Sequence, residues 1–542
     1  MLRSVLTRRA AGHPDTATET GTAYGAAMDD LLVRGARVVP LGESAEREPP
    51  SAGPGDPVDL LVRDGVVAEV GRGLDAPPGV PRVAAEGRWV VPGLWDQHVH
   101  LTQSALGLTR LDTSAVRSPQ ELLDLVVRTL RDGGARTPTG VLTAWGHRSA
   151  QWERQPNVAE LDAVTGSAPV VLISGDGHHG WLNSAALIRL GVPLRDGIVE
   201  EDEWFAIYAL LDCLPGAAQE AEQAIAQAVW HARSLGVVGI VDLEFGGSWE
   251  QWPARYAVGV GPWRVRAGVY PGRLAEILAT GRADGDAVPG TDGLVTQGPL
   301  KIISDGSLNT RTAWCCEPYA DGAALAAPSG RANVTPEQMR ELVGLAHARG
   351  LSTALHALGD AAVAAALDVF AATGAQGSIE HAQLLRPADL PRWSRLPVRA
   401  SVQPAHLLDD RSVTEQCWPD RTERTFVVAG LLAHGIPVVL GSDAPVAPLD
   451  PWLSMATAVH RGPVHAAAWH PEQALSAHQA LAASVDGQRL RPGARGDLVL
   501  IDADPLAPGD SAAQAAGLLG MPVAGTVVAG RLSGPLAGAL DG

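Results

Sequence analysis

The sequence is poor in lysine and cysteine, and it has no long apolar run. Of its 42 basic residues only Lys301 is a lysine, and all the others are arginine. Four scattered cysteines are too few for a disulfide framework, which makes a reducing cytoplasm the expected compartment. No stretch approaches the ~18–20 apolar residues of a membrane span, so we expect no membrane partner.

The net charge argues against a nucleic-acid-binding protein, and the length favours a large fold. The 542 residues include 42 basic and 60 acidic side chains, a net charge of −18, and 46% of the residues are hydrophobic. An acidic chain lacks the basic surface that displaces counterions from DNA or RNA, so we expect no nucleic-acid partner. The length suits a large barrel with an accessory domain better than one small domain.

The two ends of the chain differ from its middle. Residues 1–28 have neither a helical period nor the apolar core of a secretory signal, so we expect a disordered extension, with Met1 and Met28 as alternative starts. Short strand-like runs separated by Gly and Pro fill residues 29–90 and return in residues 494–535. This pattern predicts one small β-sandwich built from both termini.

The middle of the chain, residues 91–493, alternates strand-like runs with helical stretches. The strand-like runs are residues 89–100, 237–244, 263–270, 299–304, 351–357, 376–383, 398–404 and 436–444. Eight strands alternating with helices predict an α/β fold, a TIM-like (β/α)8 barrel. Residues 101–235 form a long insertion lobe after the first strand, and we expect this lobe to cover the active site.

Side chains that suit a metal site stand at the ends of these strands. His98 and His100 close the first strand, and later strands carry Lys301, His356, His381 and Asp443. Residues i and i+2 of a strand face the same side, so His98 and His100 can both enter the barrel mouth. Neutral imidazoles on one rim predict a divalent metal, with these six residues as its ligands. Asp96 faces the other way, where it could orient a ligand or make a turn contact.

Lys301 stands out because arginine replaces lysine everywhere else. A lysine carboxylated by carbon dioxide presents two anionic oxygens that can bridge two metal ions, and arginine does not form this product at normal basicity. An ion-pair lysine, and an unmodified lysine beside a single metal, remain open alternatives.

Asp443, in the segment GSDAP, has the chemistry of a general base and acid. A carboxylate beside the metal can take a proton from the attacking water and return it to the leaving group. The metal lowers the pKa of the water toward ~7 and polarises the substrate carbonyl. A helix-capping role for Asp443 is the alternative.

The ordered segments WDQHVH, KIISDGSLNTRTA, LHALGD, IEHAQ and GSDAPVAPLDPW resemble the amidohydrolase superfamily, specifically the amidohydrolase-3 branch of YtcJ-like and N-substituted formamide deformylase-like proteins. The resemblance runs from about residue 30 to 535. It implies an enzyme that attacks a non-peptide C–N bond, an amide or formamide of a small molecule, with hydroxide activated by a divalent metal. Zinc is the expected metal, as one ion, or as two with a carboxylated Lys301. A homodimer is expected by analogy. An ester, lactone or cyclic imide substrate and, more remotely, a non-catalytic scaffold are the alternatives.

The same resemblance points to residues of the substrate pocket. Trp145 and His178 lie in family-like segments of the insertion, and His178 is the expected catalytic donor to the substrate carbonyl or its developing oxyanion, with a structural turn histidine as the alternative. Arg311, on the loop after Lys301, either binds an acidic group of the substrate or forms a surface ion pair. His406, after the seventh strand, is a further expected pocket residue.

Overall fold

The structure, a computed structural model, describes residues 29–42, 55–133, 138–149 and 152–540. The described chain divides into two compact units, one of residues 109–220 and a larger one that joins the residues before 109 to those after 220. The expected N-terminal extension, residues 1–28, lies outside the described residues. None of the described helices combines the length and the apolarity that crossing a membrane requires.

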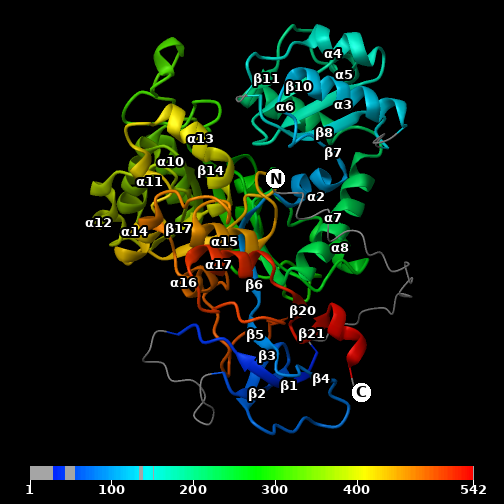
Figure 1. The fold of residues 1–542 in the computed structure, drawn as a ribbon, viewed down its shortest axis with the longest axis vertical. Helices are drawn as coiled ribbons and strands as arrows, with labels where there is room; N and C mark the ends of the chain where they lie inside the picture. Colours follow the sequence, from blue (N-terminus) through cyan, green and yellow to red (C-terminus); the bar gives the residue numbers. More distant parts are fainter. Residues whose placement is uncertain (1–28, 43–54, 134–137, 150–151, 541–542) are drawn as a thin grey trace. The chain divides into compact units, whose positions relative to one another are not determined.

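Eight parallel strands form a nearly closed barrel in the larger unit (Figure 1). In order around the barrel they are β6 (Leu94–Val99), β12 (Val237–Asp242), β13 (Arg264–Val269), β14 (Val295–Ile303), β15 (Thr353–Ala357), β16 (Gly377–His381), β17 (Val398–Val402) and β18 (Val438–Leu440). Each adjacent pair from β6 to β18 runs in parallel. The predicted (β/α)8 barrel is therefore confirmed.

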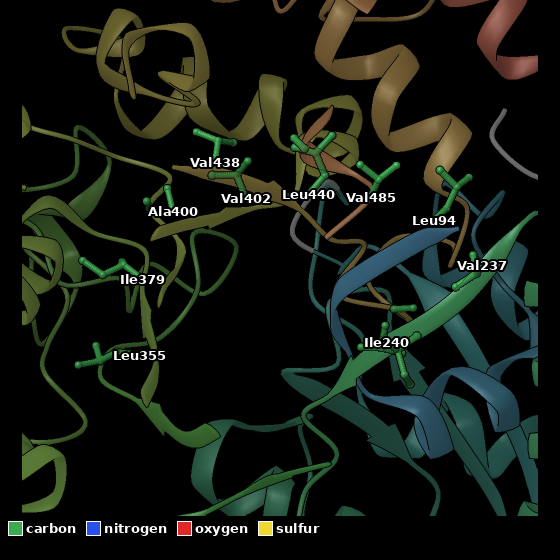
Figure 2. Close-up of a cluster of buried hydrophobic side chains, with 14 of the residues drawn as sticks. Leu94, Val237, Ile240, Leu355, Ile379, Ala400, Val402, Val438, Leu440 and Val485 are labelled. Carbon is green, nitrogen blue, oxygen red and sulfur yellow. The ribbon is translucent and has the colours of Figure 1, made fainter. Parts of the chain in front are cut away.

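Helices follow the barrel strands along the chain. They are α2 (Leu101–Thr109), α8 (Trp252–Ala257), α9 (Leu274–Thr280), α10 (Pro336–His347), α11 (Asp360–Thr373), α12 (Leu390–Trp393), α13 (Leu407–Cys417), α14 (Val428–Ala433) and α15 (Pro451–His460). The larger unit also contains most of α7 (Ala217–Ser234), and α16 (Ala477–Ala483) and α17 (Ser511–Leu519). Parallel strands are covered on both faces, which explains why β12, β15 and β16 are buried along almost their whole length. Figure 2 shows part of the resulting core, including Leu355, Ile379 and Leu440.

The run of residues 89–100 is not one strand but two. β5 (Trp89–Pro92) belongs to the terminal sheet, and β6 belongs to the barrel. Gly93 lies between them, where an added Cβ would come within 2.4 Å of a methyl group of Val238. Only glycine allows the chain to pass this close from one sheet to the other.

Strands from both ends of the chain pair in one eight-stranded sheet. Its order is β21 (Arg531–Ser533), β20 (Val523–Val528), β19 (Leu498–Ile501), β5, β1 (Leu31–Val38), β2 (Pro57–Arg63) and β3 (Val66–Gly71), with β4 (Arg82–Ala84) beside β1. Alternate residues of β1 face different apolar clusters, since Leu31 and Val33 pack in one and Leu32 in another.

Asp96 ties the first and last barrel strands together. Its carboxylate accepts the backbone N–H of His98 at 3.1 Å and that of Ser442 at 2.9 Å. Beside it, the Asp443 N–H donates to the His98 carbonyl at 2.8 Å. Burial raises the pKa of Asp96 to about 6, and the two N–H donors oppose that rise. Asp96 thus acts through the backbone of the strands that carry His98 and Asp443.

The smaller unit has its own sheet and core. Its strand order is β11 (Val199–Glu200), β10 (His179–Leu182), β9 (Val170–Ser174), β8 (Leu142–His147) and β7 (Leu111–Asp112). Its helices are α3 (Pro119–Arg131), α4 (Val158–Thr165), α5 (Ser184–Leu190) and α6 (Glu201–Leu211). Two apolar clusters pack on this sheet, one of them around the buried Trp204.

Candidate metal centre

Three donor atoms from the first and last barrel strands converge at the barrel rim. Nε2 of His98 lies 3.3 Å from Oδ1 of Asp443, and Nε2 of His100 lies 3.4 Å from the same oxygen. The three side chains each offer one ligand atom within 4.8 Å of the others. The i, i+2 spacing on β6 therefore does bring both imidazoles to one face, opposite the carboxylate that follows β18.

Lys301 lies beside this set. Its Nζ is 3.1 Å from Nε2 of His98, and its side chain is buried. Burial lowers the pKa of Lys301 to about 8, although the nearby carboxylates of Glu380 and Asp443 oppose the change. A larger fraction of the amine is therefore neutral near neutral pH than for an ordinary lysine, and the neutral amine is the form that reacts with carbon dioxide.

His356 and His381 belong to the same cluster of side chains as His98. Their ring centroids lie 4.4 Å apart, and the His381 ring lies 5.1 Å from the His98 ring. Nε2 of His356 lies 3.4 Å from Oδ1 of Asp305 and 3.3 Å from the Gly306 carbonyl oxygen. Because both neighbours accept hydrogen bonds, they favour the tautomer with the proton on Nε2 and the lone pair on Nδ1.

Two of these residues have a left-handed backbone. His381 has φ of 69° and Asp443 has φ of 55°. Residues other than glycine adopt this conformation at a cost, and it concentrates at functional sites. Here it turns the chain at the end of β16 and shortly after β18, and it directs both side chains to the rim.

The surroundings favour the neutral form of His98 and His381 and the ionised form of Asp443. Burial lowers the pKa of His98, as does the neighbouring Lys301, and burial together with His356 lowers the pKa of His381 well below its ordinary value. Burial alone would raise the pKa of Asp443, but His98, His100 and His381 hold it well below its usual range. Neutral imidazole and ionised carboxylate are the forms that bind a metal.

The donor set fits a divalent cation. Nδ1 of His100 and Nδ1 of His381 are buried and have no hydrogen-bond partner among the described residues, which is costly in a closed protein core. A cluster of imidazole and carboxylate donors is the set that zinc and similar ions prefer.

Glu380 is the residue of this site that sequence reasoning missed. Its Oε2 accepts a hydrogen bond from Nδ1 of His98 at 2.7 Å, and both side chains are buried. Burial alone would raise the pKa of Glu380, but the bond from His98 and the charge of Lys301 bring it to about 2. The ionised carboxylate fixes the His98 proton on Nδ1 and leaves the Nε2 lone pair for a ligand. An acidic residue directly before a strand-end histidine was the available signal.

Asp305 was also missed. Its carboxylate accepts the backbone N–H groups of Trp314 at 2.9 Å, Leu358 at 3.1 Å and Gly359 at 2.9 Å, besides facing Nε2 of His356. It therefore fixes the loops after β14 and β15 to one another.

The two predicted pocket residues of the larger unit occupy different environments. His406 lies near the rim, with Nε2 3.8 Å from Oδ2 of Asp443 and its ring stacked on that of His381. Together with His381 and Asp443 it forms a second group of possible ligands. Arg311 instead donates to Asp321 at 2.9 Å and to the Asn309 carbonyl at 2.8 Å, an arrangement that favours the ion-pair alternative.

The other predicted pocket residues belong to the smaller unit. Trp145 is buried in an apolar cluster with Val171 and Ile173. His178 places Nδ1 3.1 Å from Oε2 of Glu201. Their contact with a substrate stays a prediction.

Comparison with known proteins agrees with this geometry. The chain is 29% identical over 471 residues to the protein LONG AFTER FAR-RED 3 of Arabidopsis thaliana, covering 78% of each chain. It is 24% identical to the putative amidohydrolase YtcJ of Bacillus subtilis (83% of this chain, 91% of the relative) and 25% identical to the N-substituted formamide deformylase of Arthrobacter pascens (82% and 90%).

Solved structures show the same fold. An uncharacterized metal-dependent hydrolase from Pyrococcus horikoshii superposes with a TM-score of 0.71 at 24% identity, covering 89% of this chain and 99% of its own. The model of the amidohydrolase family matches residues 82–533. The strand-end donor set and this match lead to one conclusion, that the chain belongs to the amidohydrolase family of metal-dependent hydrolases.

Proposed function

We propose that the protein hydrolyses a non-peptide carbon–nitrogen bond, in an amide or formamide of a small molecule. One observation carries the proposal: Nε2 of His98, Nε2 of His100 and Oδ1 of Asp443 converge, with Nζ of Lys301 3.1 Å from His98. The likeness to a formamide deformylase over most of both chains supports the choice of bond.

The residues that would hold the metal are His98, His100, Lys301, His356, His381 and Asp443. A bound divalent cation supplies Lewis acidity toward the substrate carbonyl and the attacking water. Lys301 takes part as a carbamate in a centre with two ions: its neutral nitrogen bonds to the carbon of carbon dioxide and loses a proton. Its lowered pKa, about 8, supports this assignment.

Asp443 moves the proton. The imidazoles around it keep its carboxylate ionised, so it can accept a proton from the water that attacks the carbonyl carbon. When the C–N bond breaks, the same carboxyl group delivers that proton to the departing amine nitrogen. Glu380 and Asp305 hold the rings of His98 and His356 in place during these steps.

The test is release of free amine from N-formyl and N-acyl amines by metal-loaded protein. Replacing the base by Asp443→Asn should lower kcat about 10²–10⁴-fold. Metal content, measured by elemental analysis, separates loss of the base from loss of the ion. Asp75→Asn, at an exposed position, is the matched control and should behave as the unmodified chain.

Two results would contradict the proposal. Unchanged amine release by the Asp443→Asn protein with its metal in place would contradict the role of Asp443 in moving the proton. Turnover of esters, lactones or cyclic imides without turnover of any open-chain amide would keep the metal centre but change the bond.

A further inference from the structure

Phe245 is an exposed aromatic side chain that lies against the metal centre. Its ring stacks on that of His100, with centroids 5.1 Å apart and planes inclined by 25°. It nevertheless keeps 41% of its surface exposed. The chain has only four phenylalanines, and Phe370 and Phe426 are buried in the core. Phe245 therefore differs from these two phenylalanines, because it lies exposed beside a candidate metal ligand.

The segment that carries Phe245 is held firmly. It follows β12, and the Leu243 N–H donates to the Val99 carbonyl of β6 at 2.7 Å. The Glu244 carboxylate accepts the Gln103 backbone N–H at 3.1 Å and its side-chain amide at 3.0 Å. The Phe245 N–H donates to the same carboxylate at 3.0 Å. These bonds fix the backbone of Phe245 relative to the strand that ends in the two histidines.

A second ring supports Phe245. Tyr270 packs against it with centroids 5.2 Å apart, and the Tyr270 hydroxyl donates to the Leu243 carbonyl at 3.0 Å. The Tyr270 hydroxyl therefore already has a hydrogen-bond partner within the protein. Because Glu244 is occupied by Gln103 and by backbone, Phe245 offers a neighbouring substrate group apolar area rather than a counter-charge.

We propose that Phe245 is a specificity-determining residue, an apolar wall that selects substrates with a flat apolar substituent next to the scissile bond. The inference rests on the proposed hydrolysis and names its substrate class. A flat ring laid on Phe245 would cover its exposed part and gain offset stacking as well as buried area. The substituent can belong to the acyl or to the amine side, and matched substrate series distinguish the two.

The experiment compares KM and kcat for aryl and short alkyl substituents, varied on the amine side in one series and on the acyl side in another. For one of the two series, Phe245→Ala should raise KM for the aryl members about 3–10-fold, with little change for the alkyl members or in kcat. Phe245→Leu, which stays apolar but not flat, should lie between. Trp230→Ala removes an aromatic ring that is 72% exposed on α7. It is the matched control, and we expect KM and kcat for every substrate to stay unchanged.

A binding measurement separates this inference from the proposed function. Calorimetric titration of the Asp443→Asn protein, with and without Phe245→Ala, reports the aryl preference even if nothing is hydrolysed. Loss of the aryl preference in the double variant supports the wall. Equal weakening of aryl and alkyl ligands, or loss of metal from Phe245→Ala, would overturn it and show that the ring only supports His100. Aryl selectivity in binding, together with no amine release by the unmodified protein, would support the role of Phe245 and contradict the proposed hydrolysis.

Discussion

Replacing Glu380 should weaken metal binding without removing a ligand. The hydrogen bond from Nδ1 of His98 to Oε2 of Glu380 is 2.7 Å long and fully buried. Hydrogen bonds to a charged group contribute about 1.5–3 kcal/mol and neutral ones about 0.5–1.5 kcal/mol. Glu380→Gln keeps an acceptor but loses the charge, a difference of about 1.5 kcal/mol, or roughly tenfold in affinity. Glu380→Ala loses the whole bond, and we expect about a hundredfold weaker binding.

The assay is a competition between the protein and a chelator of known affinity, read by elemental analysis of the protein. Glu341→Gln, on the exposed side of α10, is the control and should bind metal as the unmodified chain does. Activity at saturating metal should recover far more in Glu380→Gln than in Asp443→Asn. Unchanged affinity in both Glu380 variants would refute the reasoning that this carboxylate orients His98.

Two further predictions concern single side chains. Lys301→Arg keeps the positive charge but cannot carry carbon dioxide, so the proposed two-ion centre should hold one ion or none in this variant, measured by elemental analysis. As many ions as in the unmodified chain would exclude the carbamate. Asp486 lies in ion pairs with Arg266 and Arg495, and although burial raises its pKa, the two guanidinium groups bring it from 3.8 to about 2. Asp486→Asn should therefore lower the free energy of unfolding by about 2 kcal/mol at neutral pH. Because the pKa is lower in the folded protein, this stabilisation is present above pH ~4 and lost as the pH falls toward 2, so denaturant titrations of the two proteins should converge in acid. A constant difference between them at all pH values would contradict the ion-pair origin.

The barrel and its rim were predictable because simple periodicities control them. Apolar runs with intervening helices predict parallel strands, and the carboxyl ends of such strands share one edge. His98 and His100 needed only the two-residue period of a strand. The break at Gly93 was not predictable in this way, since apolar residues stand on both sides of it, Val91 before and Leu94 after, and the close approach to Val238 is visible only in the structure.

The supporting residues follow from tertiary geometry that the sequence does not display. Strand alternation would place Glu380 and His381 on opposite sides of β16, but the left-handed backbone of His381 turns its own side chain out of that alternation. Asp305 acts mainly on backbone N–H groups some 50 positions away, as its bond to Gly359 shows. Contacts of this kind depend on loop conformation, which residue types alone do not specify.

The bond between Asp96 and the backbone of Ser442 joins positions 346 residues apart. The strand before Ser442, β18, is only three residues long, so it has little pairing of its own to close the ring. During synthesis, His98 and His100 emerge early, yet the carboxylate they face arrives only near the end of translation. The donor set of His98, His100 and Asp443 is therefore complete only after Asp443 has been synthesised, and the full set can bind a cation only from that point on.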